Sequence, residues 1–507
     1  MVMTVEFRTS AALALALATS SAVSARADAA APEPPVARSP IYLAQGGPAP
    51  APATRGVPGG PENISPNPAN DTTGNLSVAS PSVPTSAPPR IGLFPEFGAN
   101  LLSRGIDFHG VAFDQFLANP SAGVKPGNTT NVGEFSPAVD LDLGRLVGIP
   151  GGNVHIRTTT YFLKSNKPQA IQQFGGQLDG YQATPSLAKT NLSVLTYEQK
   201  LLNDRLSIEV GRTTVHRYFF LPNSIDPFTY YSTTVETNGD FNPPPFPVWG
   251  GKATFRLTPA WYVQAGAFEE NFQRKAQNSN NFGVTGATGT SIIAELGYRT
   301  EFVNDDYPAN LEVGGEWNTR GAAGNIKAVP VPYNGRNAAA PYEGGGNLFL
   351  SAQKVVWRGA RIPNGPPPNI ALFTNLAVAV DKPQPFDLDA LVGVNFTGLI
   401  SGHPFDAVGL TARYARLSAV EAAFETRVAN ILVGRGPSQS RDGFQFEIAG
   451  NIQLTPSISV TPTVQYYVNP DAYDRAAQRG RPRDGFIAGI FTTVSLGRLL
   501  GTSQKPF

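Results

Sequence analysis

The feature that most constrains this chain is a two-residue alternation of apolar and polar side chains that recurs from residue 92 to residue 497. Phe444, Phe446 and Ile448, for example, alternate with Gln445 and Glu447. Successive side chains of a β-strand point to opposite faces, so each such segment predicts a strand with one apolar and one polar face. We therefore expect an all-β protein.

About sixteen segments carry this alternation, and an even number of strands suits a closed transmembrane barrel. They are 104–118, 134–145, 152–163, 190–200, 205–213, 248–258, 261–269, 291–300, 309–318, 347–358, 370–380, 389–399, 406–417, 443–455, 457–468 and 485–497. The pattern predicts a transmembrane antiparallel β-barrel with its apolar side toward lipid and its polar side toward water.

The links between these segments mostly alternate between short ones, such as 201–204 and 258–260, and long ones, such as 165–189. Transmembrane barrels have tight turns at one rim and long loops at the other. Two links break the order, because 381–388 is short where a long link is due and 359–369 is long where a short one is due. The asymmetry still favours a barrel over a soluble sandwich.

Composition excludes several classes of function. Of the 507 residues, 52 are Gly and 46 are Pro, which suits many short strands and turns. A net charge of +1 provides no concentrated basic surface for nucleic acid. With no Cys and four scattered His, we expect no disulfide and no zinc site. The sequence has no nucleotide-binding motif, so we expect no cofactor.

The N-terminus has the features of an export signal, which we place at 1–27. Arg8 precedes the apolar run 11–18, and small residues lead to a cleavage site near residue 27. The Pro-, Ala- and Gly-rich segment 28–90 is expected to be a disordered linker, either a periplasmic tether or a partial plug. The barrel domain then covers 91–497, and a tail covers 498–507.

Several stretches, taken in order, resemble the OprB family of carbohydrate-selective porins. They are 104–124 (RGIDFHGVAFDQFLANPSAGV), 140–156, 195–212 (LTYEQKLLNDRLSIEVGR), 256–271, 295–299 and 452–470. The resemblance implies a sixteen-stranded barrel in the outer membrane of a Gram-negative bacterium, through which small sugars diffuse passively into the periplasm. The sequence departs from the family pattern at 213–220 (TTVHRYFF), and Phe507 lies beyond the closing strand.

Charged residues within strands are expected to face the pore, because a Lys or Arg facing lipid at mid-bilayer costs roughly 2–4 kcal/mol and an acid somewhat less. This places ten residues inside: Arg157, Glu198, Glu209, Arg256, Glu295, Arg299, Glu312, Glu316, Arg413 and Glu447. Each is either a contact for the permeating solute or a wall residue in a ladder of ion pairs.

The long loop 214–247 is expected to narrow the lumen. It brings aromatic side chains together with charged ones: Tyr218, Phe219, Phe220, Phe228, Tyr230, Tyr231, Phe241 and Phe246 beside Arg217, Asp226, Glu236 and Asp240. The C–H faces of sugars stack on aromatic rings, and sugar hydroxyls accept hydrogen bonds from Arg and donate them to carboxylates. The alternative is that these rings pack the loop against the wall.

Arg157, Arg212 and Arg217 are the preferred sugar contacts. Arg157 lies on a strand that matches the family, and the other two flank the start of the long loop. For Arg212 the alternative is a position at the strand end, paired with a loop carboxylate.

Other functions stay open at this point. The sequence has no GxSxG, HExxH or P-loop motif, so we expect no enzyme, although two carboxylates that meet in space could form a hidden glycosidase pair. A general or anion-preferring porin and an exported soluble β-protein that binds polysaccharide are the alternatives. The expected partners are small sugars and outer-membrane lipid, with the porin as a monomer or a homotrimer.

Overall fold

The computed structural model describes most of the chain from residue 92 to residue 503. The described residues are 92–164, 190–219, 238–239, 241, 246–271, 282–283, 287, 289–302, 304–319, 326–330, 337–341, 344–360, 367–381, 384–433, 438–471 and 482–503. The expected signal peptide (1–27) and linker (28–90) lie outside this part.

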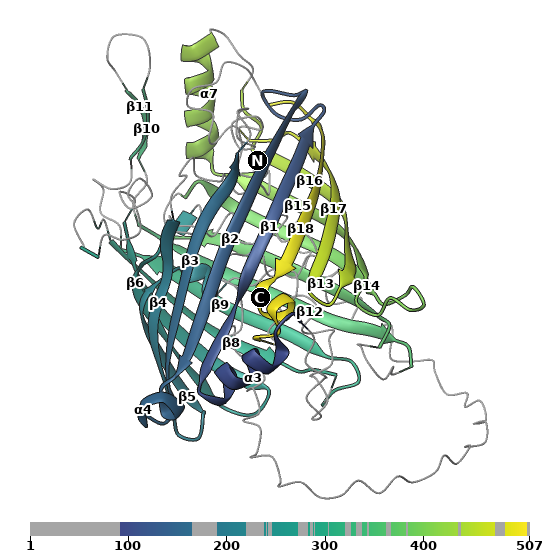
Figure 1. The fold of residues 1–507 in the computed structure, drawn as a ribbon. Helices are drawn as coiled ribbons and strands as arrows, with labels where there is room; N and C mark the ends of the chain where they lie inside the picture. Colours follow the sequence, from purple (N-terminus) through teal and green to yellow (C-terminus); the bar gives the residue numbers. More distant parts are fainter. Residues whose placement is uncertain are drawn as a thin grey trace, which may run out of the picture. The chain divides into compact units, whose positions relative to one another are not determined.

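Sixteen antiparallel strands form a closed barrel in which β1 pairs with β18 (Figure 1). They are β1 (Ile106–Asn119), β2 (Asn128–Asp142), β3 (Gly152–Lys164), β4 (Thr190–Leu201), β5 (Leu206–Thr213), β6 (Val248–Arg256), β7 (Trp261–Glu270), β8 (Gly289–Arg299), β9 (Ala309–Asn318), β12 (Gly346–Arg358), β13 (Asn369–Val380), β14 (Phe386–Thr397), β15 (Ala407–Leu417), β16 (Asp442–Thr455), β17 (Ile458–Val468) and β18 (Gly485–Ser495). The predicted fold class and strand number are confirmed.

The predicted and observed strand ends differ most at β2, which begins at Asn128 rather than at residue 134. Residues 128–131 read NTTN and carry no apolar side chain, so the alternation could not mark them. The irregular links at 359–368 and 381–385 are both present between the strands.

Short elements that the alternation did not predict are not part of the barrel wall. They are α3 (Pro95–Ser103), α4 (Leu143–Val147), the 3-10 helix η3 (Val215–Arg217), the hairpin β10 (Ile326–Pro330) with β11 (Asn337–Pro341), α7 (Ala419–Val433) and α8 (Leu496–Leu500). Among the described residues, no helix has the length and apolar character needed to cross a membrane.

The closing strand ends two residues earlier than predicted because α8 begins there. The Ser495 side chain accepts a hydrogen bond from the Arg498 backbone N–H, and Gly501 ends the helix with φ 78°. The backbone N–H of Leu93 donates to the Leu499 carbonyl (2.9 Å), and the Thr502 hydroxyl donates to the Phe108 carbonyl (2.7 Å). The segments before β1 and after β18 are therefore joined beside the seam of the barrel.

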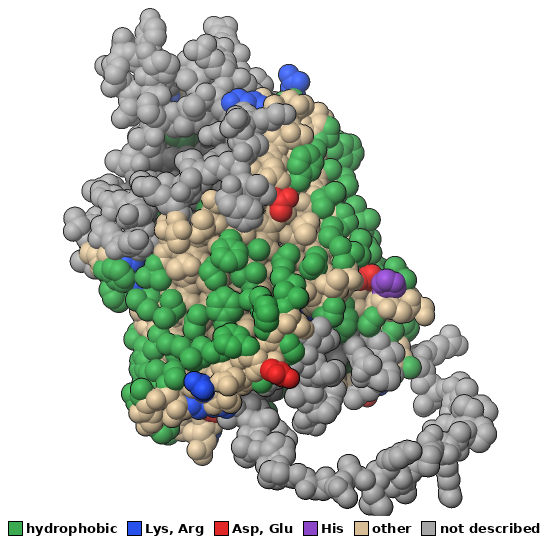
Figure 2. Space-filling model, in the orientation of Figure 1, with side chains coloured by type: hydrophobic (Ala, Val, Ile, Leu, Met, Phe, Trp, Pro, Cys, Tyr) green, Lys and Arg blue, Asp and Glu red, His purple; other side chains and the backbone are tan. Residues whose placement is uncertain are grey.

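The outer face of the barrel is apolar, as Figure 2 shows for one side. On β16, Phe446 and Ile448 are half-exposed on the outside, whereas Gln445 and Glu447 are buried inside. All four Trp of the chain lie on the outer face close to strand ends. Trp261 and Trp357 lie at the rim of the short links, and Trp249 and Trp317 lie at the rim of the long loops. An apolar band flanked by aromatic residues at both rims is typical of a barrel that crosses a membrane.

Candidate functional site

The inner wall of the barrel carries the polar side chains that a solute would meet. The ten charged strand residues predicted to face inward all lie on this face. Arg157, Glu198, Glu209, Glu295, Glu312, Glu316, Arg413 and Glu447 are buried, and Arg256 and Arg299 are half-buried. Whether any of them contacts a permeating solute remains a prediction.

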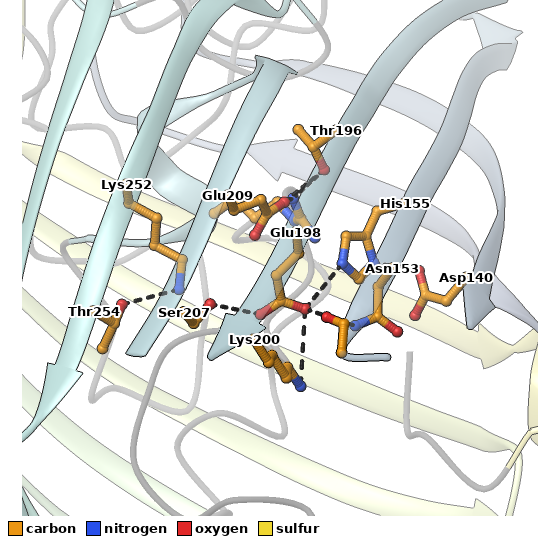
Figure 3. Close-up of polar contacts among 12 residues, drawn as sticks. Asp140, Asn153, His155, Thr196, Glu198, Lys200, Ser207, Glu209, Lys252 and Thr254 are labelled. Atoms are coloured by element: carbon orange, nitrogen blue, oxygen red, sulfur yellow. Dashed lines mark hydrogen bonds and ion pairs between the residues drawn. The ribbon is translucent and has the colours of Figure 1, made fainter. Parts of the chain in front are cut away.

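A first polar cluster surrounds Glu198, near the end of β4 at the short-link rim (Figure 3). The Glu198 carboxylate accepts from the Ser207 hydroxyl (2.7 Å) and lies 3.5 Å from His155 Nε2. The other ring nitrogen of His155 lies 2.8 Å from the carboxylate of Asp140, and Lys200 lies 3.8 Å from Glu198. Acids and bases therefore alternate from β2 to β5 along this part of the wall.

The second cluster joins the long loop to the wall at Arg217, the last residue of η3. Its guanidinium donates to the Glu209 carboxylate, to Thr196 Oγ1 (3.1 Å) and to the Tyr218 hydroxyl (2.9 Å). The Tyr218 ring centroid lies close to two cations, 5.2 Å from the Arg217 guanidinium carbon and 5.3 Å from the Lys252 ammonium nitrogen. An ion pair with further hydrogen bonds thus fixes the start of the loop to β4 and β5.

The wall also binds the loop backbone. Gln264 on β7 donates from its amide to the Tyr218 carbonyl (2.8 Å) and to Glu295 Oε1 (3.0 Å), and it accepts from Thr254 (2.8 Å). The loop segment and strands β6 to β8 therefore share one hydrogen-bond network.

The aromatic residues at the loop start pack against the wall. Tyr218 and Phe219 are fully buried, and their rings lie 6.0 Å and 6.1 Å from that of Phe268. The apolar cluster also includes Val215, Phe241, Val248, Ile293, Phe349 and Ala377. In this arrangement neither ring offers a face to a passing sugar, so packing accounts for both residues.

Asn238 ties the far part of the loop to other strands, and sequence reasoning missed it. Its amide donates to Asn347 Oδ1 on β12 (2.9 Å) and to the Phe386 carbonyl on β14 (2.9 Å), and it accepts from the Phe386 N–H (3.0 Å). The side chain is fully buried. An Asn followed by a Gly in a long loop resembles an ordinary turn, so no sequence signal pointed to this role.

Arg212 lies on the other face of the wall from the one expected. It pairs in register with Leu195 and with Trp249, whose side chain is exposed on the outside. Its guanidinium carbon lies 5.9 Å from the Trp249 ring and 5.1 Å from the Phe282 ring, and Nη2 donates to the Pro247 carbonyl (2.8 Å). Arg212 is therefore a residue of the outer face at the strand end, and the expectation that it contacts sugar in the pore is wrong.

The remaining predicted residues are spread along the wall. Arg413 on β15 pairs with Asp389 on β14 through two hydrogen bonds of 2.9 Å and 2.5 Å. Glu447 accepts from the Gln465 amide (2.6 Å). Arg157 lies on β3, next to β4 of the Arg217 cluster, whereas Arg299 is the last residue of β8, three strands from β5. Asp226, Phe220, Phe228, Tyr230, Tyr231, Glu236 and Asp240 lie outside the described residues.

Comparison with known proteins identifies the family of this chain. The model of the family described as "Carbohydrate-selective porin, OprB family" matches residues 128–496. The chain belongs to the OprB family. Porin B of Pseudomonas aeruginosa is 21% identical over 414 residues, which cover 77% of this chain and 87% of that protein.

A solved structure shows the same fold. The high-pH structure of Pseudomonas putida OprB has a TM-score of 0.64 and 18% identity, covering 78% of this chain and 96% of that one. The low-pH structure of the same protein has a TM-score of 0.49 and 15% identity, covering 81% and 100%.

This OprB-family chain is accordingly a carbohydrate-selective diffusion porin of a Gram-negative outer membrane. The predicted family, function and location are confirmed. A soluble protein that binds polysaccharide does not fit a membrane barrel, and the family indicates a channel rather than an enzyme.

Proposed function

We propose that this porin favours neutral sugars over anions because its lumen wall has no excess of positive charge, and that no chemical step is involved. The observation that carries the proposal is the pairing of Arg217 with Glu209. A buried guanidinium that is already held by a carboxylate does not attract anions into the lumen as a bare cation would.

The balance of buried charge argues against the anion-preferring alternative. Among the described strand residues, buried acids outnumber buried inner-face cations. The acids are Glu134, Glu198, Glu209, Glu270, Glu295, Glu312, Glu316, Asp389 and Glu447, and the cations are Arg157, Lys252 and Arg413. With Arg217 added from the loop, the wall still provides no net positive field to collect anions.

The side chains that remain partly accessible on this wall suit weak contact with a sugar. Asp140, His155 and Lys200 line the short-link rim with side chains that are 19%, 15% and 31% exposed. They offer both donors and acceptors within a few ångströms of each other. Short links lie on the periplasmic side of such barrels, so we infer that sugars enter at the long-loop rim and leave past these residues. Weak contacts are required, because tight ones would slow exit.

Transport by the pure protein tests the proposal. Liposome swelling should be faster with neutral mono- and disaccharides than with an anionic solute of similar size, and single channels should show no anion preference. Swelling rates that follow size alone, or a reversal potential that favours anions, would contradict it.

Lys200→Met should weaken the block of ion current by added sugar, because one donor at the exit is lost. The matched control is Lys354→Met, since Lys354 is exposed on the outer face. Equal block of the ion current by sugar in the two variants would show that Lys200 does not contact the solute.

A further inference from the structure

Large apolar side chains are exposed at the short-link rim of β1 to β5. Phe94 and Phe97, at the start of α3, are 57% and 59% exposed, and Val147 on α4 is 65% exposed. Leu202, in the link between β4 and β5, is 63% exposed. Single exposed apolar residues are ordinary on a protein surface, but a contiguous set indicates a contact.

Hydrogen bonds join these three segments, so their exposed side chains form one surface. The Arg145 guanidinium on α4 donates to the Leu102 carbonyl on α3 (2.7 Å), and the two helices lie at the same end of the barrel (Figure 1). The Gln199 amide on β4 donates to the Pro150 carbonyl after α4 (2.9 Å). We call the exposed apolar set the rim patch, and its members are Leu93, Phe94, Phe97, Leu146, Val147, Ile149, Leu201 and Leu202.

The α3 part of the rim patch is held in place and is not a frayed end. The Phe94 N–H donates to the Leu500 carbonyl (2.8 Å). Gly98, one position after Phe97, lies so close to Gly501 that a Cβ atom would collide with the Gly501 backbone. The contact with the end of α8 therefore fixes the two exposed Phe rings at the rim.

The rim patch continues the lipid-facing surface of the barrel. Leu201 is the last residue of β4, and nearer the middle of the barrel Tyr197 of β4 pairs in register with Val210 of β5. These two side chains are 37% and 52% exposed on the outer face. Trp261 lies at the same rim, and Trp side chains gather where a membrane meets water. The rim patch therefore adjoins the apolar band at the edge of the membrane.

The charges around the rim patch indicate what covers it. Arg104, Arg145 and Arg205 are exposed among its members, and Glu96 and Asp204 are exposed beside them. Acyl chains alone would leave these charges without partners. The phosphate of a phospholipid headgroup suits the guanidinium groups, and an ammonium group on the same headgroup suits the carboxylates. Apolar side chains bordered by charged ones are typical of segments that lie in the headgroup layer.

We propose that the rim patch binds the headgroup layer of the periplasmic leaflet, with its Leu, Val, Ile and Phe side chains at the boundary with the acyl chains. The partner is a phospholipid that carries both a phosphate and an ammonium group, as phosphatidylethanolamine does. The contact holds the short-link ends of β1 to β5 at a fixed depth. It does not depend on how the lumen selects its solute.

Fluorescence quenching tests the depth of the rim patch, because the chain has no Cys of its own and single sites can be labelled. Val147→Cys and Phe97→Cys, each labelled with NBD in the full-length porin, are placed in vesicles of phosphatidylethanolamine and phosphatidylglycerol. Both labels should be quenched more strongly by lipid with a nitroxide on its headgroup than by aqueous iodide. Both variants should keep wild-type rates of liposome swelling with sugar, which shows that the barrel is folded.

The matched control is Lys125→Cys, which is exposed in the link between β1 and β2 at the opposite rim and should be quenched mainly by iodide. Iodide quenching at residues 97 and 147 that equals the quenching at residue 125 would overturn the proposal. So would strongest quenching by a nitroxide at the end of the acyl chain, because the neighbouring charges would then lie in hydrocarbon. Labels that are open to iodide in these vesicles but shielded in native outer membranes would show a protein partner in place of lipid.

Discussion

Two parts of the inner wall are both held by buried ion pairs and hydrogen bonds, but the partners in these bonds come from different elements of the fold. On β14 to β17, Arg413 pairs with Asp389, and Glu447 pairs with Gln465, strand to strand. On β4 to β8, Glu209 finds its cation in Arg217, and Gln264 binds the Tyr218 carbonyl, so partners come from the long loop. The two side-chain pairs of the first part need only barrel strands, although Asn238 of the loop also binds the Phe386 backbone at the start of β14. The second part is complete only when the loop is folded against it.

Because of this difference, we expect one set of residues to control the stability of the barrel and another set to control the width of the pore. Changes on β14 to β17 should loosen the wall without moving the loop. Changes at Arg217 should release the loop from the wall. The predictions below test that separation, beginning with the largest expected effect.

Arg217→Met should widen the pore and abolish discrimination among solutes. It leaves Glu209 buried without its cation, and breaking a buried pair in this way costs about 3–5 kcal/mol. The loop start is then no longer fixed, so single-channel conductance should rise severalfold and swelling rates for sugars and charged solutes should converge. The double variant Arg217→Met with Glu209→Leu removes the unpaired charge and should recover the stability but not the selectivity. If Arg217→Met kept the relative permeabilities of the wild type, Arg217 would not be the residue that holds the loop in the pore.

Arg413→Met should destabilise the barrel by a similar amount, about 3–5 kcal/mol, because Asp389 is left buried and unpaired. The urea midpoint and the temperature of the unfolding band shift on gels should both fall. Relative permeabilities for sugars should stay as in the wild type. A change in selectivity as large as that of Arg217→Met would contradict the separation.

Arg212→Gln should have the smallest effect. The side chain lies on the outer face against Trp249 and Phe282, so conductance and sugar discrimination should remain unchanged. Stability should fall by about 1 kcal/mol through the lost cation–π contacts. A loss of sugar selectivity in this variant would show that Arg212 acts on the solute in the pore.

Much of the fold followed from one physical requirement, that a membrane barrel alternates apolar and polar faces. The alternation located every barrel strand, and it failed where a face loses its apolar character, as in residues 128–131 of β2. Short helices such as η3 and α8 carry no periodic signal long enough to detect. Their ends are set by local hydrogen bonds instead.

The candidate site was less predictable than the fold, because the long loop 214–247 brings its residues together. Arg212 shows an avoidable error, since three positions separate it from Glu209 and a period of two puts the pair on opposite faces. Asp114 on β1 points outward, because its neighbours Phe113 and Gln115 are buried inside, and it therefore violates the rule that strand charges face the pore. Asn238 depends on contacts with residues more than a hundred positions away, and these exist only in the folded barrel.

The join between the two ends of the barrel wall has a mechanical consequence. Leu93 and Phe94 hydrogen-bond to the carbonyls of Leu499 and Leu500, just where the first and last strands meet. A pulling force on the upstream residues would reach these two bonds before it reached the β1–β18 ladder. The attachment would thus carry load before the β1–β18 pairing does, and it protects the seam where the first and last strands of the barrel meet.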